Sequence, residues 1–133
     1  MRAAVDSSIL LDILLPDEKY AEASLSLLES HAARGALLIC PVAYAETAAA
    51  FSPSSAFETV AAEMGLVYVQ FSPQVAVLAG QMWQDYRRQG GPRRRIMSDF
   101  LIGAHAQLEA DLLLSRDRGY YRDYFQGLQV VGP

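Results

Sequence analysis

The stretch Ala3-Ala4-Val5-Asp6-Ser7-Ser8-Ile9-Leu10-Leu11, close to the N-terminus, decides the fold class. A short apolar run ends at Val5, an acidic residue follows, and apolar side chains then continue as far as Leu15. A brief apolar run is typical of a buried strand, and the longer run that stops at Pro16 indicates a helix. This strand, acid and helix pattern recurs along the chain and predicts an α/β protein.

The remaining segments alternate in the same way. We expect strands at residues 2–5, 36–40, 66–70, 112–114 and 128–131, the last at an edge of the sheet. Helices are predicted between them, with Asp17 and Ser98 as N-caps and with helix starts at Ser52-Pro53 and Ser72-Pro73. Residues 1–133 should form a single domain with a central, mostly parallel sheet that helices flank on both faces.

Composition excludes several classes of protein. Hydrophobic residues make up 52% of the 133 positions, which argues against intrinsic disorder. No apolar run reaches the roughly 18 residues that a membrane span needs, so we expect no membrane contact. The N-terminus meets Asp6 without a long apolar segment, which is unlike a signal peptide, and Cys40 is the only cysteine. We therefore expect a cytoplasmic protein without an internal disulfide or a thiolate metal site.

Four acidic residues stand where predicted elements begin or end: Asp6, Glu46, Asp99 and Asp117. Asp6 and Asp117 follow buried strands, and ligands of open α/β sheets bind at the carboxyl ends of strands. Carboxylates gathered in one crevice repel one another unless a proton or a cation joins them. Oxygen ligands favour hard cations such as Mg²⁺ or Mn²⁺, so the pattern indicates metal-dependent phosphoryl-transfer chemistry.

Each acid also has a simpler interpretation. Asp6 is a suitable helix N-cap, and Asp99 would interact favourably with a helix N-terminus. Glu46 could be an ordinary surface residue of an alanine-rich helix, and Asp117 could form a local ion pair with a neighbouring arginine. The metal interpretation is stronger because one site explains all four residues together. Asp12 is at best a residue that supports such a site.

Four stretches of the chain resemble the PIN-domain nucleases, and within them the VapC-type toxins of toxin–antitoxin pairs. The stretches are residues 5–12, 41–46, 94–106 and 113–121, which stand in the order of the family and carry the four acids. The chain departs from the family where Ser7-Ser8 follows the first acid and where Ser115 stands for a usual threonine. Both departures keep a hydroxyl group that can bind a carboxylate or a metal-bound water.

The resemblance implies an endoribonuclease that hydrolyses an RNA phosphodiester and leaves a 5′-phosphate and a 3′-hydroxyl. Asp6, Asp99 and Asp117 would hold Mg²⁺, for which Mn²⁺ could substitute, and Glu46 would complete the cluster or orient the attacking water. Ser7 and Ser115 would support these acids. The family also implies a cognate antitoxin as partner, and commonly a homodimer. A catalytically idle PIN-fold scaffold is the alternative, and an enzyme acting on DNA or on a small phosphoester stays open.

Further residues are candidates for binding RNA or the antitoxin. The second half of the chain holds eight arginines in two groups, and Arg93, Arg94, Arg95 and Arg116 could form a phosphate-binding rim around the acids. A salt-bridged or solvated basic face is the alternative. An apolar groove for the antitoxin is predicted at Leu10, Leu14, Leu25 and Leu28. We expect Trp83 and the aromatic residues 120–125 to pack in the core, with stacking of the latter on RNA bases as the alternative. We expect His105 to lie in the core or on the surface rather than at the site.

Overall fold

The computed structural model describes residues 1–91 and 96–133, which form a five-stranded sheet with the strand order β3-β2-β1-β4-β5. Every neighbouring pair of strands is parallel, whereas the sequence predicted a mostly parallel sheet. The elements are β1 (Arg2–Val5), α1 (Ser7–Leu14), α2 (Ala21–Ala32), β2 (Ala36–Ile39), α3 (Pro41–Ala48), α4 (Ala56–Glu63), β3 (Leu66–Tyr68), α5 (Pro73–Arg88), α6 (Met97–Glu109), β4 (Leu112–Leu114), α7 (Arg118–Tyr124) and β5 (Val130–Val131).

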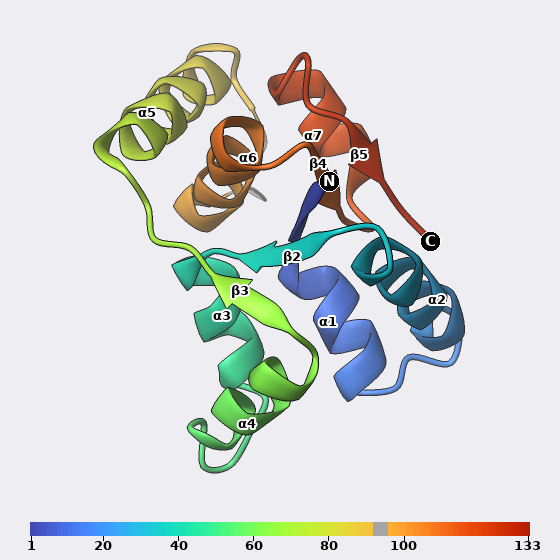
Figure 1. Ribbon diagram of the computed structural model, residues 1–133. Helices are drawn as coiled ribbons and strands as arrows, with labels where there is room; N and C mark the ends of the chain where they lie inside the picture. Colours follow the sequence, from blue (N-terminus) through green and yellow to red (C-terminus); the bar gives the residue numbers. More distant parts are fainter. Residues whose placement is uncertain (92–95) are drawn as a thin grey trace.

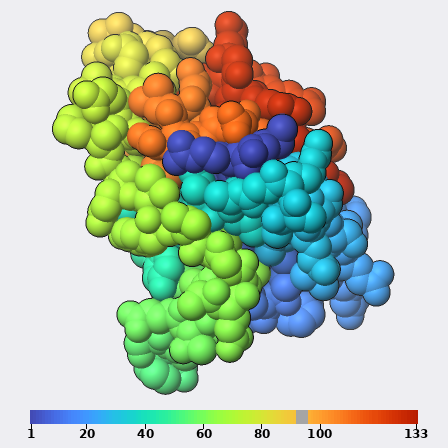
Figure 2. Space-filling view, in the orientation of Figure 1, coloured from blue at the N-terminus to red at the C-terminus, as the bar shows by residue number. Residues whose placement is uncertain are grey.

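Helices cover both faces of the sheet. α1 to α4 lie on one side, and α5, α6 and α7 lie on the other (Figure 1). The first three strands run outward from β1 in one direction, and the chain then returns to add β4 and β5 on the other side of β1. The N-terminal segment accordingly lies between the segments of β2 and α6 in the space-filling view (Figure 2). This reversal between β1 and β4 makes the carboxyl ends of these two strands the expected ligand site.

The central strands are apolar because both of their faces are buried. Ala3, Ala4 and Val5 of β1 and all three leucines of β4 are almost fully buried. The small side chains of β1 let helices approach closely on both faces, while the bulk of the core comes from β2, β4 and the helices. All five predicted strands are present, and β5 is at an edge, as expected.

Several helix starts differ from the prediction. Asp17 accepts hydrogen bonds from the backbone of Lys19 and Tyr20, so it closes a turn before α2 rather than capping that helix. α4 begins at Ala56, after a turn that follows Pro53. Ser98 is inside α6, which begins at Met97. Ser72 does cap α5, because its hydroxyl accepts a hydrogen bond from the Val75 amide at 3.2 Å.

Two of the four leucines predicted to form the antitoxin groove are buried, so this part of the prediction was wrong. Leu10 and Leu28 are 0% and 4% exposed, so both belong to the core, whereas Leu25 is 42% exposed and Leu14 is half-buried. The aromatic residues of α7 pack as expected, since Tyr120, Tyr121 and Phe125 are buried. His105 is also buried, with Nε2 at 3.0 Å from the Val69 carbonyl oxygen. Among the described residues, no helix has the length and apolar character that crossing a membrane demands.

Candidate active site

Asp6 lies at the reversal point of the sheet. Its amide donates to the Leu114 carbonyl at 3.0 Å, which continues the pairing of β1 with β4 and brings Asp6 next to Ser115. Asp6 precedes α1, yet its carboxylate forms no capping hydrogen bond to that helix, so the simple N-cap interpretation does not explain it. The side chain is buried, with 6% of its surface exposed. A carboxylate placed here requires polar partners.

Serine hydroxyls supply those partners. Ser115 donates to Asp6 Oδ2 at 2.6 Å, and Ser8 donates to the same oxygen at 3.1 Å. Ser7 donates to Glu46 Oε1 at 3.0 Å and lies 3.5 Å from Asp6 Oδ1. The structure thus places both predicted supporting serines against the acids and adds Ser8. Ser8 was missed although it stands in the same dipeptide as Ser7.

The pKa values of Asp6 and Glu46 are both raised. Burial is the main cause for Asp6, the hydrogen bonds from Ser115 and Ser8 oppose it, and the charge of Asp99 adds to it. Burial also raises the pKa of Glu46, with Ser7 opposing and the charges of Asp6 and Asp99 contributing. Ser7 contacts the carboxylates of both Asp6 and Glu46, and the charge of Asp99 acts on both, so we call these three acids and their serines the acidic crevice. The charged forms of Asp6 and Glu46 are therefore both disfavoured.

Asp99 has two roles at the start of α6. Its Oδ2 accepts a hydrogen bond from the Ile96 amide at 3.0 Å, so the carboxylate caps the first turn of the helix. It is half-buried, and its charge acts on Asp6, Glu46 and Tyr121. The helix-capping interpretation and the site interpretation therefore both apply to this residue. Residues 92–95, which include the predicted rim residues Arg93, Arg94 and Arg95, lie outside the described part of the chain.

Asp117 stands at the N-terminus of α7 and is half-buried. Its amide donates to Ser115 Oγ at 3.0 Å, which connects it to Asp6 through a single serine. Tyr121, one helical turn further along, is buried beside the same acids. Burial raises its pKa well above 10, and the charges of Asp6, Asp99 and Asp117 contribute. Sequence reasoning missed Tyr121, although a spacing of four residues from Asp117 places both on one helix face.

Arg116 is engaged by other residues. Its Nε lies 3.1 Å from Asp12 Oδ2, and its guanidinium group lies over the Tyr20 ring at 4.4 Å. Asp12 is buried and also accepts a hydrogen bond from Ser24 at 2.8 Å. The arrangement fastens the loop after β4 to α1 and α2. Arg116 consequently has a structural partner in the protein, and Asp12 is a buried member of an ion pair rather than a residue of the acidic crevice.

The donor set fits a hard cation in its chemistry, because it consists of carboxylate oxygens with serine hydroxyls hydrogen-bonded to them. Within residues 1–91 and 96–133, however, no group of three or more acidic, histidine or cysteine side chains is arranged to hold a metal ion. Mg²⁺ commonly binds one or two carboxylates and keeps several waters. A site of that kind, centred on Asp6, is compatible with the geometry.

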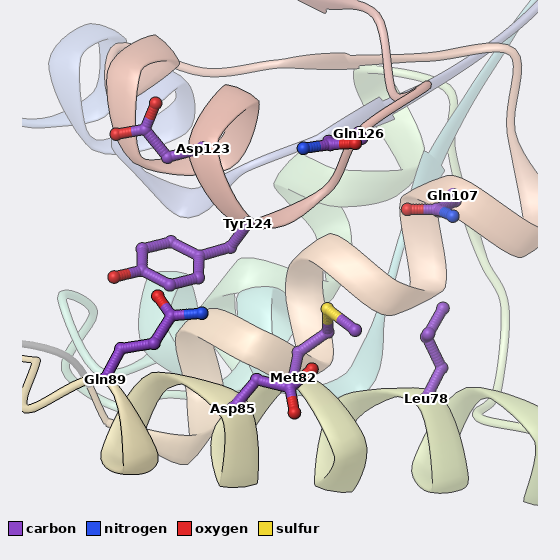
Figure 3. A pocket seen from close by; sticks show the side chains of 8 residues that line it. All are labelled: Leu78, Met82, Asp85, Gln89, Gln107, Asp123, Tyr124 and Gln126. Atoms are coloured by element: carbon purple, nitrogen blue, oxygen red, sulfur yellow. The ribbon is translucent and has the colours of Figure 1, made fainter.

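A cavity elsewhere does not contribute to this site. It measures about 320 Å³ and lies between α5, α6 and the end of α7 (Figure 3). Its lining consists of Leu78, Met82, Asp85, Gln89, Gln107, Asp123, Tyr124 and Gln126. None of the four predicted acids lines it. The acidic crevice is therefore identified by its carboxylates and serine hydroxyls and by its position at the carboxyl ends of β1 and β4.

Comparison with known proteins agrees with this architecture. The family model described as the PIN domain matches residues 3–125. No curated protein sequence matches the chain. VapBC2 from Rickettsia felis, solved with a DNA fragment from its promoter, superposes with a TM-score of 0.77 at 18% identity, covering 100% of this chain and 99% of that chain.

Two further solved structures share the fold. A toxin–antitoxin complex from Klebsiella pneumoniae has a TM-score of 0.66 at 20% identity and covers 97% of this chain and 95% of that chain. VapC20 from Mycobacterium tuberculosis, described as a toxin that cleaves the sarcin–ricin loop, has a TM-score of 0.63 at 13% identity. It covers 89% of this chain and 93% of that chain. At these identities the similarity establishes the fold.

Proposed function

The chain belongs to the PIN-domain family, and from this premise we propose that it is a metal-dependent endoribonuclease that acts as the toxin of a toxin–antitoxin pair. The observation that carries the proposal is the buried Asp6 at the sheet reversal, whose pKa is raised by burial and by the charge of Asp99, and which contacts Glu46 through Ser7. A buried carboxylate with a raised pKa next to other acids is typical of a functional site. RNA as substrate is supported by the ribosomal-RNA-directed activity stated for VapC20, which has the same fold.

Asp6 and Asp99 would hold Mg²⁺ or Mn²⁺, and Glu46 and Asp117 would contribute directly or through water. When bound, such an ion lowers the pKa of water and neutralises charge on the phosphoryl oxygens. Ser115 and Ser8 keep the Asp6 carboxylate in one orientation. Glu46, which is more exposed than Asp6, orients the attacking water toward the scissile phosphate. The products would be a 5′-phosphate and a 3′-hydroxyl.

The antitoxin would cover the surface next to this crevice. Support comes from the VapBC and toxin–antitoxin complexes that share the fold. Leu10 and Leu28 are in the core and cannot contact a partner. The apolar residues that α1 and α2 offer to the antitoxin are therefore Leu14, Leu15 and Leu25. A homodimer, which the family resemblance implied, belongs to the same proposal and would be measured by light scattering of the free protein.

Cleavage of labelled structured RNA by antitoxin-free protein tests the activity, with Mg²⁺, with Mn²⁺ and with chelator. Native protein is compared with Asp6→Asn and Asp99→Asn, and with Glu58→Gln as a matched control at an exposed carboxylate of α4. We expect metal-dependent cleavage that the first two substitutions abolish and the control retains. Cleavage that survives both substitutions would contradict the proposal. Folded protein without cleavage of any RNA would favour the catalytically idle scaffold.

A further inference from the structure

A second cavity, of about 470 Å³, opens on the C-terminal half of α5. It is lined by Trp83, Gln84, Arg87 and Arg88. The Arg87 guanidinium group lies 5.9 Å from the centroid of the Trp83 ring, and Trp83 is half-buried. Trp83 thus packs on the core with part of its ring and presents the rest to this cavity. The sequence predicted only the packing role for this residue.

One wall of the cavity contacts the N-terminal part of α6, the helix that carries Asp99. The Trp83 ring meets Phe100 edge-on, with 5.4 Å between centroids, and Phe100 follows Asp99 in the first turns of α6. Tyr86 supports both rings from the same side of α5, stacking on Trp83 at 6.3 Å and contacting Phe100 at 5.4 Å. An aromatic contact therefore connects the wall of the cavity to the helical turn that carries Asp99 of the proposed active site.

Two arginines supply the positive charge of the cavity. Arg87 and Arg88 are exposed, and in the parts of the chain that the structure describes neither is within ion-pairing distance of a carboxylate. A simpler interpretation is that both arginines complement the C-terminal dipole of α5. That interpretation does not account for a cavity whose wall is an indole ring. An indole face next to two guanidinium groups is the combination that binds single-stranded nucleic acid.

We propose that this cavity binds a single-stranded stretch of the RNA substrate next to the scissile phosphate, with a base stacked on Trp83 and phosphates on Arg87 and Arg88. The proposal rests on the ribonuclease function proposed above. A chain with a net charge of −4 and an acidic crevice repels RNA, so substrate needs a cationic surface close to that crevice. Arg87 is exposed, which leaves its guanidinium group free to move from the indole face to a phosphate when a base arrives.

Trp83 is the only tryptophan of the chain, so its fluorescence reports on the cavity directly. The full-length protein, in chelator to prevent cleavage, is titrated with a single-stranded RNA of twelve nucleotides at several salt concentrations. Binding is followed both by Trp83 fluorescence and by the anisotropy of a label on the RNA. We expect saturable quenching of Trp83 with the same midpoint as the anisotropy change.

The variant Arg87→Gln/Arg88→Gln should bind this RNA about tenfold or more weakly. The slope of log affinity against log salt should become shallower by about 1.4, because each phosphate contact on a single strand contributes about 0.7. The charge-matched control is Arg2→Gln/Arg34→Gln at the opposite end of the strands, where the N-terminus contacts the Arg34 carbonyl. This control should keep the native slope.

RNA binding with unchanged Trp83 fluorescence and an unchanged salt slope would overturn the proposal, as would the absence of RNA binding. If the double variant binds RNA normally but binds the antitoxin more weakly, the cavity binds an acidic protein segment instead of RNA. That result would also overturn the proposal. Cleavage is measured separately. If native protein shows RNA-dependent quenching of Trp83 but does not cleave RNA in the presence of metal, only the nuclease function is contradicted. If native protein cleaves RNA but Trp83 is not quenched, only the proposed RNA cavity is contradicted.

Discussion

Ser115 Oγ donates a hydrogen bond of 2.6 Å to Asp6 Oδ2, although the two residues are 109 positions apart. The contact exists because β4 pairs with β1, so that the residues following the two strands meet at the same edge of the sheet. Ser115 also accepts the Asp117 amide, and one hydroxyl thereby positions two of the four acids. This serine therefore connects Asp6 at the end of β1 with Asp117 at the start of α7.

Replacing Ser115 by alanine should destabilise the protein by about 1–3 kcal/mol, because a buried carboxylate loses its shortest hydrogen bond. Ser8→Ala removes a longer bond of 3.1 Å from a half-buried hydroxyl and should cost less. Urea unfolding of both variants in chelator measures the difference. Equal losses would mean that Ser115 has no special role at Asp6.

Asp6→Asn should stabilise the metal-free protein at neutral pH. The pKa of Asp6 is raised in the folded state, so the native protein loses stability as pH rises from the unfolded pKa near 3.8 through the folded value. Each unit of that increase corresponds to about 1.4 kcal/mol. Melting in chelator should therefore show an advantage for Asp6→Asn at pH 7 that shrinks toward pH 4. A variant that is less stable than native protein at pH 7 would contradict this expectation.

His105 should give the opposite dependence on pH. Burial lowers its pKa, so the unfolded chain takes up the proton first and the folded protein loses stability as pH falls below about 6.5. His105→Gln keeps a donor for the Val69 carbonyl and removes this titration. The difference in melting temperature between native protein and His105→Gln should change between pH 7 and pH 5. Parallel melting curves over that range would count against a neutral buried imidazole.

Millimolar Mg²⁺ or Mn²⁺ should raise the melting temperature, because a ligand that binds only the folded state stabilises it, by about 2.7 kcal/mol at one hundred times its Kd. Asp99→Asn should reduce the shift, and Glu58→Gln should leave it unchanged. Differential scanning fluorimetry in metal and in chelator is the measurement. An identical shift in native protein and Asp99→Asn would place the ion elsewhere.

Arg116→Gln should destabilise the protein more than Asp12→Asn. Asp12 is 2% exposed, whereas the Arg116 side chain is 37% exposed, so removal of the arginine leaves a buried carboxylate that water cannot reach. The reverse change leaves a cation that solvent can hydrate. Urea unfolding of both variants tests the order, and the opposite order would show that the pair is not held together by the burial of Asp12.

Sequence patterns determined the strand and helix content of this protein and the resemblance that the PIN-domain match bears out. They also placed Asp6, Asp99 and Asp117 correctly at the start of a helix, whereas Glu46 lies inside α3 and not at an element boundary. These features are local, since periodicity, proline and charge act over a few residues. Helix starts at residues such as Asp17 and Ser98 were less predictable, because a side chain able to cap a helix can equally close a turn or lie inside the first turn.

Only the tertiary structure decided which distant residues meet. It brought Ser115 to Asp6 and Arg116 to Asp12, buried Leu10 and Leu28, and buried Tyr121 where the charges of three acids act on it. The order of strands in a sheet depends on how the helices pack across its two faces, and no local pattern records that order. Hydrogen bonds and burial at the sheet reversal therefore follow from the packing of the whole chain, while the residues available to form them were set by its sequence.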